Sequence, residues 1–135
     1  MRGARVGGRL GKVRGTLYRM PVLVSTVDAA TAHAAKSFLG RVAAMYPVDY
    51  AILFGSRARQ NHQPDSDADI AVVLHGLHGE RTAAAIGMAG IAFDVLLDTG
   101  ILVQALPLWQ DDMDHPEQFS NPALIDNIRR EGVRL

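Results

Sequence analysis

Apolar residues at helical spacing mark the first helix of the chain. Six of them recur every three or four positions: Val27, Ala30, Ala34, Phe38, Val42 and Met45. This spacing predicts a helix over residues 26–45. Ser25 is the predicted N-cap, Asp28 favours the first turn through the helix dipole, and Pro47 ends the helix.

Short apolar runs after this helix have the length of strands. They cover residues 50–54, 70–74, 91–97 and 101–108. Pro107 interrupts the last run, and the alanine-rich residues 79–88 predict a helix between the second and third. Asn121 and Pro122 begin a C-terminal helix that Gly132 ends. This order predicts a small α+β domain, with a mixed sheet of about four strands flanked by helices.

The composition narrows the class of protein. A chain of 135 residues corresponds to one domain, and at this size it buries about two-thirds of the surface that the unfolded chain exposes. The absence of cysteine excludes disulfides, thiol catalysis and zinc sites built on sulfur. A helix needs about 20 apolar residues to span a bilayer, and no apolar run approaches this length. We therefore expect a cytoplasmic protein with no membrane partner.

The formal net charge of zero is the sum of a basic segment and an acidic segment. Residues 1–20 contain six basic residues, five glycines and no acidic residue, which predicts a disordered basic extension. Three interpretations stay open for it: a non-native extension before Met20, a nucleic-acid-binding arm, or a solvated tail. Residues 21–135 contain eight basic and fourteen acidic residues, and direct nucleic-acid binding by this acidic part is not expected.

Two carboxylates stand at the start of the second apolar run. If Asp67 and Asp69 begin a strand, alternation places both side chains on one face, about 6–7 Å apart. Paired hard oxygen ligands suit Mg²⁺, which binds through one or two carboxylates plus substrate phosphates. By itself an Asp-x-Asp pair is usually a solvated turn. An EF-hand is excluded, because Ile70 and Gly76 occupy its sixth and twelfth positions.

The first apolar run ends in a turn suited to an anion. Gly55-Ser56 follows the strand directly, and a strand that turns into a helix there presents free backbone N–H groups. Arg57 and Arg59 lie in the same turn, where they can screen the charge of a triphosphate. A lone Gly-Ser is most often an ordinary loop, and no P-loop motif is present.

Together these residues resemble one known family. Residues 55–59, Gly-Ser-Arg-Ala-Arg, are followed after nine residues by Asp-Ile-Ala-Val-Val at 69–73. This arrangement resembles the G-S-x(n)-D-x-D signature of the DNA polymerase β-type nucleotidyltransferase superfamily. Residues 64–70, Pro-Asp-Ser-Asp-Ala-Asp-Ile, match the form found in its minimal members, the MNT-type domains. The resemblance covers roughly residues 26–100 and implies a polymerase β-like nucleotidyltransferase domain over residues 21–135.

The resemblance assigns a role to each part of the motif. Asp67 and Asp69 match the two metal-ligating, catalytic aspartates of the family. Gly55 and Ser56 match the pair that holds the β- and γ-phosphates, with Arg57 and Arg59 beside them as nucleotide-binding residues.

A third carboxylate usually comes from the next strand in this family. Asp94, in the apolar run 91–97, is the expected match as a catalytic and metal-binding residue, since a charged residue in so apolar a strand needs a reason. Asp98 shares its face by alternation and is the alternative. Family members often carry Gly at the position of Gln60, so we expect Asn61 to provide the left-handed turn instead.

The resemblance implies a Mg²⁺-dependent nucleotidyltransferase with a two-metal site. It would move a nucleoside monophosphate, AMP from ATP or the equivalent from another NTP, to a hydroxyl. Only about 35 residues follow Gly100, so we expect the acceptor to come from a partner. In the MNT family this is a tyrosine of a HEPN-domain toxin, which the enzyme neutralises as an antitoxin. The alternatives are a small-molecule adenylyltransferase that completes its acceptor site as a homo-oligomer, and an antitoxin that binds its partner without catalysis.

Overall fold

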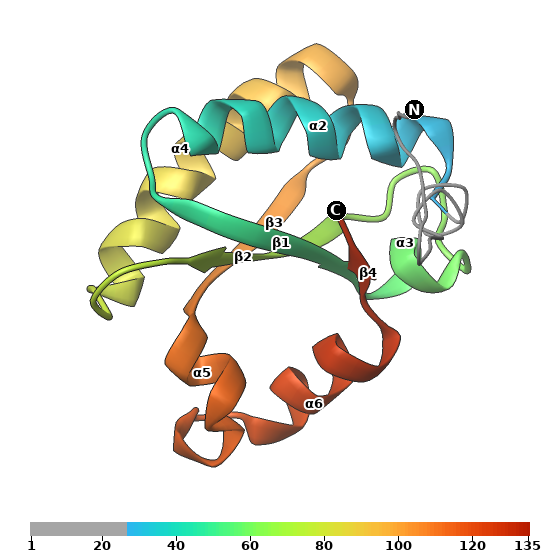
Figure 1. Cartoon of the computed structure of the whole chain (residues 1–135). Helices are drawn as coiled ribbons and strands as arrows, with labels where there is room; N and C mark the ends of the chain where they lie inside the picture. Colours follow the sequence, from blue (N-terminus) through green and yellow to red (C-terminus); the bar gives the residue numbers. More distant parts are fainter. Residues whose placement is uncertain (1–26) are drawn as a thin grey trace, which may run out of the picture.

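The computed structural model of the chain describes residues 27–135, which form a four-stranded mixed sheet (Figure 1). The strands are β1 Val48–Phe54, β2 Ala68–Leu74, β3 Val103–Trp109 and β4 Val133–Arg134. Their order in the sheet is β3-β2-β1-β4, with β1 antiparallel to β2 and β4 and with β2 parallel to β3. The predicted α+β class is therefore confirmed. The predicted extension over residues 1–20 and the predicted N-cap Ser25 lie outside the described residues.

Helices cover both faces of this sheet (Figure 1). The helices are α2 Ala29–Ala43, α3 Ser56–Arg59, α4 Arg81–Thr99, α5 Gln110–Asp114 and α6 Pro122–Glu131, with a 3₁₀ turn at Pro116–Gln118. Helices α2 and α4 pack on one face, where Ile70 and Val72 of β2 join their core. Helices α5 and α6 pack on the other face, against Ala71 and Val73 of the same strand. Because β2 is buried on both faces, its sequence is a continuous apolar run without alternation.

The first helix has the predicted position but a different N-cap. Helix α2 begins after Asp28, whose side chain accepts a hydrogen bond from the Thr31 backbone N–H at 3.1 Å. The C-terminal prediction is also confirmed, since Asn121 and Pro122 begin α6 and Gly132 follows its last residue. A Cβ on Gly132 would lie 2.3 Å from the Ile52 side chain, so glycine allows the chain to return to the sheet as β4.

The strand predicted over residues 91–97 is wrong. These residues continue the helix predicted over 79–88, and α4 runs unbroken to Thr99, with Gly100 at φ 79° as its C-cap. Its buried residues, Ala84, Met88, Ala92 and Val95, keep helical spacing. Its exposed side carries Ile86, Phe93 and Leu97. Apolar residues on both sides of a helix remove the 3.6-residue period, and the sequence then looks like a buried strand.

Helix α4 is apolar enough to meet the length and composition criteria for a membrane span. It has 19 residues and a mean hydropathy of 1.4, and 17% of its 18-residue window is buried. Core helices of soluble proteins meet the same criteria, and α4 packs on the sheet through its buried residues. The absence of a membrane partner therefore stays a prediction.

The fourth predicted strand is confirmed as β3, two residues later than expected at its start. Pro107 lies within it, opposite Val72 of β2. The sheet order places β3 at an edge, where a residue without a backbone N–H removes no hydrogen bond to a further strand.

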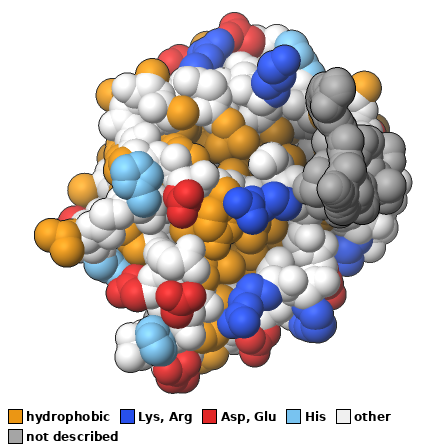
Figure 2. Space-filling model, viewed as in Figure 1, with side chains coloured by type: hydrophobic (Ala, Val, Ile, Leu, Met, Phe, Trp, Pro, Cys, Tyr) orange, Lys and Arg blue, Asp and Glu red, His pale blue; other side chains and the backbone are white. Residues whose placement is uncertain are grey.

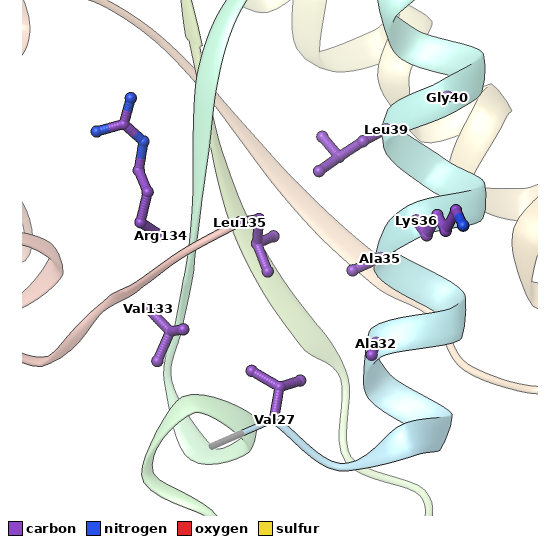
Figure 3. Close-up of a pocket in the computed structure, with 9 residues that line it drawn as sticks. All are labelled: Val27, Ala32, Ala35, Lys36, Leu39, Gly40, Val133, Arg134 and Leu135. Atoms are coloured by element: carbon purple, nitrogen blue, oxygen red, sulfur yellow. The ribbon is translucent and has the colours of Figure 1, made fainter. Parts of the chain in front are cut away.

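An apolar groove separates α2 from β4 (Figure 3). Its volume is about 560 Å³. Its apolar lining consists of Val27, Ala32, Ala35, Leu39, Val133 and Leu135. Arg134, between Val133 and Leu135, stacks instead over the Tyr50 ring, with 3.9 Å from its guanidinium carbon to the ring centroid. Figure 2 shows hydrophobic side chains reaching the surface in the middle of this face. No predicted site residue lines the groove, so it is separate from the candidate site.

The left-handed residue after α3 is Gln60, and the prediction that Asn61 supplies this turn is wrong. Gln60 has φ 60° and ψ 32°, and within residues 27–135 no other non-glycine residue has a positive φ. We expect Gln60→Gly to raise the free energy of unfolding by about 1 kcal/mol, because a side chain in this conformation clashes with its own backbone. Urea denaturation measures this change. Asn61→Gly is the control and should give no gain; an unchanged or lower stability for Gln60→Gly would contradict the prediction.

Candidate active site

Three strands bring the predicted motif together at one end of the sheet. Phe54, the last residue of β1, pairs with Asp69 of β2, so the next residue, Gly55, lies beside the Asp69 carboxylate. Asp67 directly precedes β2. On the other side, Asp69 pairs in parallel with Gln104 of β3. Residues that are far apart in the chain therefore meet at one sheet end.

Gly55 leaves room for the Asp69 carboxylate. It has φ 75°, and a Cβ at this position would lie 2.3 Å from Oδ2 of Asp69. Any side chain would displace the carboxylate, so both the backbone conformation and the space require glycine. The Gly55 carbonyl accepts hydrogen bonds from the backbone N–H groups of Ala58 and Arg59, both at 3.1 Å, which starts α3 immediately after the turn.

The two carboxylates repel each other. Burial of Asp69 raises its pKa, and the charge of the exposed Asp67 raises it further, while the Arg59 guanidinium opposes both effects. A cation between the two carboxylates would relieve this repulsion, and their oxygen donors suit a hard divalent ion such as Mg²⁺. The residues present therefore fit a divalent metal.

Gln104 is a site residue that the sequence did not reveal. Its side-chain Nε2 donates a hydrogen bond to Oδ2 of Asp67, with a distance of 3.2 Å. One feature of the sequence does point to Gln104. It is a polar residue near the start of the apolar run that forms β3. The strand predicted over residues 91–97 placed the third polar side chain on α4 instead of β3.

The prediction of Asp94 as the third carboxylate is wrong. Asp94 is exposed on α4, not on a strand beside β2. Within residues 27–135, Asp67, Asp69 and Asp94 do not form a group with ligand atoms within 4.8 Å of one another. The alternative, Asp98, also lies on α4, where it pairs with Arg41. Among the described residues, no third carboxylate therefore lies beside Asp67 and Asp69.

Arg57 has a structural role, which corrects its assignment as a nucleotide-binding residue. Its side chain is 2% exposed. The guanidinium donates to the Thr31 hydroxyl at 2.7 Å and to the backbone carbonyls of Pro64 and Ser66 at 3.0 Å. It therefore ties the loop before Asp67 to α2 and does not face a ligand.

Arg59 is the arginine that faces the site. It is exposed, and its positive charge lowers the pKa of Asp69. Within residues 27–135 it has one ion pair, with Glu131, which is long at 3.5 Å. A phosphate can therefore recruit this side chain without breaking a strong contact.

A second group of potential ligands lies away from this site. His78, Asp111 and Asp112 offer ligand atoms within 4.8 Å of one another. Asp112 already accepts two hydrogen bonds from Arg81 at 3.1 Å and one from the Trp109 backbone at 2.9 Å. A hydrogen bond from His78 lowers the pKa of Asp111. The carboxylates of Asp111 and Asp112 therefore already have hydrogen-bond partners within the protein, and we assign this group a structural role.

The mixed sheet, the Gly55-Ser56 turn and the two carboxylates are the features that the sequence predicts for a nucleotidyltransferase-type domain. Residues 40–103 match the family model described as polymerase β, nucleotidyltransferase. This match includes the Gly55-Ser56 turn and both carboxylates, Asp67 and Asp69, so the chain is similar to the family over this part.

A solved structure from Sulfolobus solfataricus, described as "a putative nucleotidyltransferase", is also similar to the chain. It is 22% identical, with a TM-score of 0.47, and the alignment covers 76% of this chain and 84% of that one. No curated protein shows significant similarity to the chain.

Proposed function

We propose that the protein transfers AMP from ATP to a hydroxyl of a partner protein, as an MNT-type antitoxin that modifies a tyrosine of a HEPN-domain toxin. The observation that carries the transfer chemistry is the Asp67/Asp69 pair, held beside the Gly55-Ser56 turn at one end of the sheet. The choice of ATP, of tyrosine and of a HEPN-type partner rests on the resemblance to MNT-type domains.

Each site residue has a defined task in this proposal. Asp67 and Asp69 would hold Mg²⁺, and the ion would supply positive charge to the triphosphate and to the transferred phosphate. Gly55 lets a phosphate approach the backbone, the Ser56 hydroxyl donates a hydrogen bond to it, and Arg59 screens its charge. Arg57 keeps the loop before Asp67 in place.

The surface supports an acceptor on another protein. Within the described residues, the chain after Gly100 completes the sheet and covers its second face, and it forms no separate acceptor domain. Ile86, Phe93 and Leu97 expose 55–69% of their surface along α4. Exposed apolar side chains that recur along one helix are typical of a protein-binding surface.

One observation favours a second candidate, an antitoxin that binds its partner without catalysis. Gln104, a neutral side chain, contacts Asp67 where a third carboxylate was expected. The exposed apolar residues of α4 would serve such binding equally well.

The intact mass of the partner distinguishes the two candidates. The protein is incubated with a co-purified HEPN-type partner, ATP and Mg²⁺, and in parallel with each other NTP. We expect the partner to gain the mass of AMP, and a tyrosine-to-phenylalanine variant of the modified residue to gain nothing. Neutralisation of the toxin with no added mass would support binding alone. Modification of a small molecule and not of the partner would contradict the proposed acceptor.

A further inference from the structure

The candidate site has two carboxylates and one amide. Gln104 lies opposite Asp69 in the parallel β2/β3 ladder, and its Nε2 bonds to Asp67 at 3.2 Å. Among the described residues, no other acidic side chain or histidine joins the two aspartates in a ligand group. The side chain that β3 places beside the two aspartates is therefore neutral.

We infer that Gln104 restricts this site to one divalent cation. Two carboxylates balance the charge of one such ion. A second dication a few ångströms away needs further negative charge to offset their mutual repulsion. Gln104 has no charge to offer, and the hydrogen bond that it donates occupies one Asp67 oxygen. The inference rests on the proposed function, because it takes the site as one that binds metal and nucleotide.

Gln104→Glu provides the complementary change. Glutamate has nearly the same size and reach as glutamine, and Gln104 lies at an exposed position, so the substitution adds a carboxylate with little change in packing. The three carboxylates would then resemble the ligand sets that hold two neighbouring ions. Without metal they would repel one another, and Mn²⁺ would remove that repulsion.

The test is a count of bound metal that does not depend on catalysis. Mn²⁺ is titrated into the full chain with a non-transferable ATP analogue, and free Mn²⁺ is measured by electron paramagnetic resonance, with the analogue alone as the blank. We expect one Mn²⁺ per bound nucleotide for the wild type and for Gln104→Ala, and two for Gln104→Glu. The thermal midpoint of Gln104→Glu should also rise more with Mn²⁺ than that of the wild type.

The outcomes separate this inference from the proposed function. Two Mn²⁺ per nucleotide in the wild type would overturn the inference and leave the proposed function standing. Two Mn²⁺ in Gln104→Ala would also overturn it, because a site with only the two aspartate carboxylates would then hold two ions without a third negative charge. No saturable binding of nucleotide or Mn²⁺ by the wild type would overturn the proposed function and the inference with it. If Gln104→Glu does not fold, the wild-type and Gln104→Ala counts still decide the question.

Discussion

Replacing Asp69 with asparagine is expected to lower nucleotide transfer about 1000-fold. In the proposed function the two aspartates would hold a cation that stabilises the developing charge, and such stabilisation amounts to several kcal/mol. Each 1.36 kcal/mol changes the rate tenfold, so a loss of about 4 kcal/mol corresponds to this factor. Transfer to the partner, followed by mass spectrometry under single-turnover conditions, measures the rate.

The same substitution should stabilise the metal-free protein. The pKa of Asp69 in the folded state is raised, first by burial and then by the charge of Asp67. Its ionisation therefore opposes folding, and stability is lost as the pH rises from the unfolded-state value of about 3.9 through the raised folded-state pKa. We expect Asn to remove this loss and to raise the stability at pH 7 by less than about 1 kcal/mol, because solvent screens a half-exposed carboxylate.

Asp65→Asn is the matched control for both effects. Asp65 is an exposed turn residue two positions before Asp67, and its substitution should change neither the transfer rate nor the stability. A transfer rate of Asp69→Asn close to that of the wild type would show that the carboxylate pair is not the site. A lower stability in metal-free buffer would show that the repulsion at Asp69 is unimportant.

Replacing Arg57 with alanine is expected to destabilise the fold by about 3 to 5 kcal/mol. The buried guanidinium donates three hydrogen bonds, and at the lower end of the range for charged donors, about 1.5 kcal/mol each, their sum is about 4.5 kcal/mol. Its removal leaves the Thr31 hydroxyl and two loop carbonyls without this partner, and it opens a cavity. Urea denaturation in the absence of nucleotide measures the change in the free energy of unfolding.

Arg59→Ala is the counterpart on the exposed side of the same short helix. Its ion pair with Glu131 is exposed and long, so its loss should lower stability by less than about 1 kcal/mol. Nucleotide binding should weaken about tenfold, because a charge-assisted contact to phosphate is lost. The opposite pattern, with Arg57→Ala stable but deficient in nucleotide binding, would restore Arg57 as a ligand-binding residue.

Local chemistry in the sequence was enough to place the central residues of the candidate site. Gly-Ser after one apolar run and Asp-x-Asp before the next placed Gly55 and the carboxylates at facing strand ends, and the β1/β2 ladder confirms this placement. This succeeded because the two strands are neighbours in the chain and in the sheet. Their pairing follows from a short connection.

The third position could not be found in this way. Gln104 comes to Asp69 only through the parallel β2/β3 pair, which needs the whole of α4 as its crossover. The period of α4 is hidden because apolar residues occupy its exposed side as well as its buried one. With that helix divided into a helix and a strand, Asp94 was placed beside the aspartates and Gln104 was missed.

The sequence by itself determined the class of fold, the Gly55-Ser56 turn and the Asp67/Asp69 pair, because each depends on spacing within a short stretch of chain. The tertiary structure alone decided which arginine is buried, which residue adopts the left-handed turn, and which side chain completes the site. These depend on contacts between segments that are distant in sequence: Arg57 with Thr31 of α2, and Gln104 with Asp67 across the sheet. Burial and strand register exist only once the layers have assembled, and they make one arginine structural and leave a neutral amide beside the carboxylates.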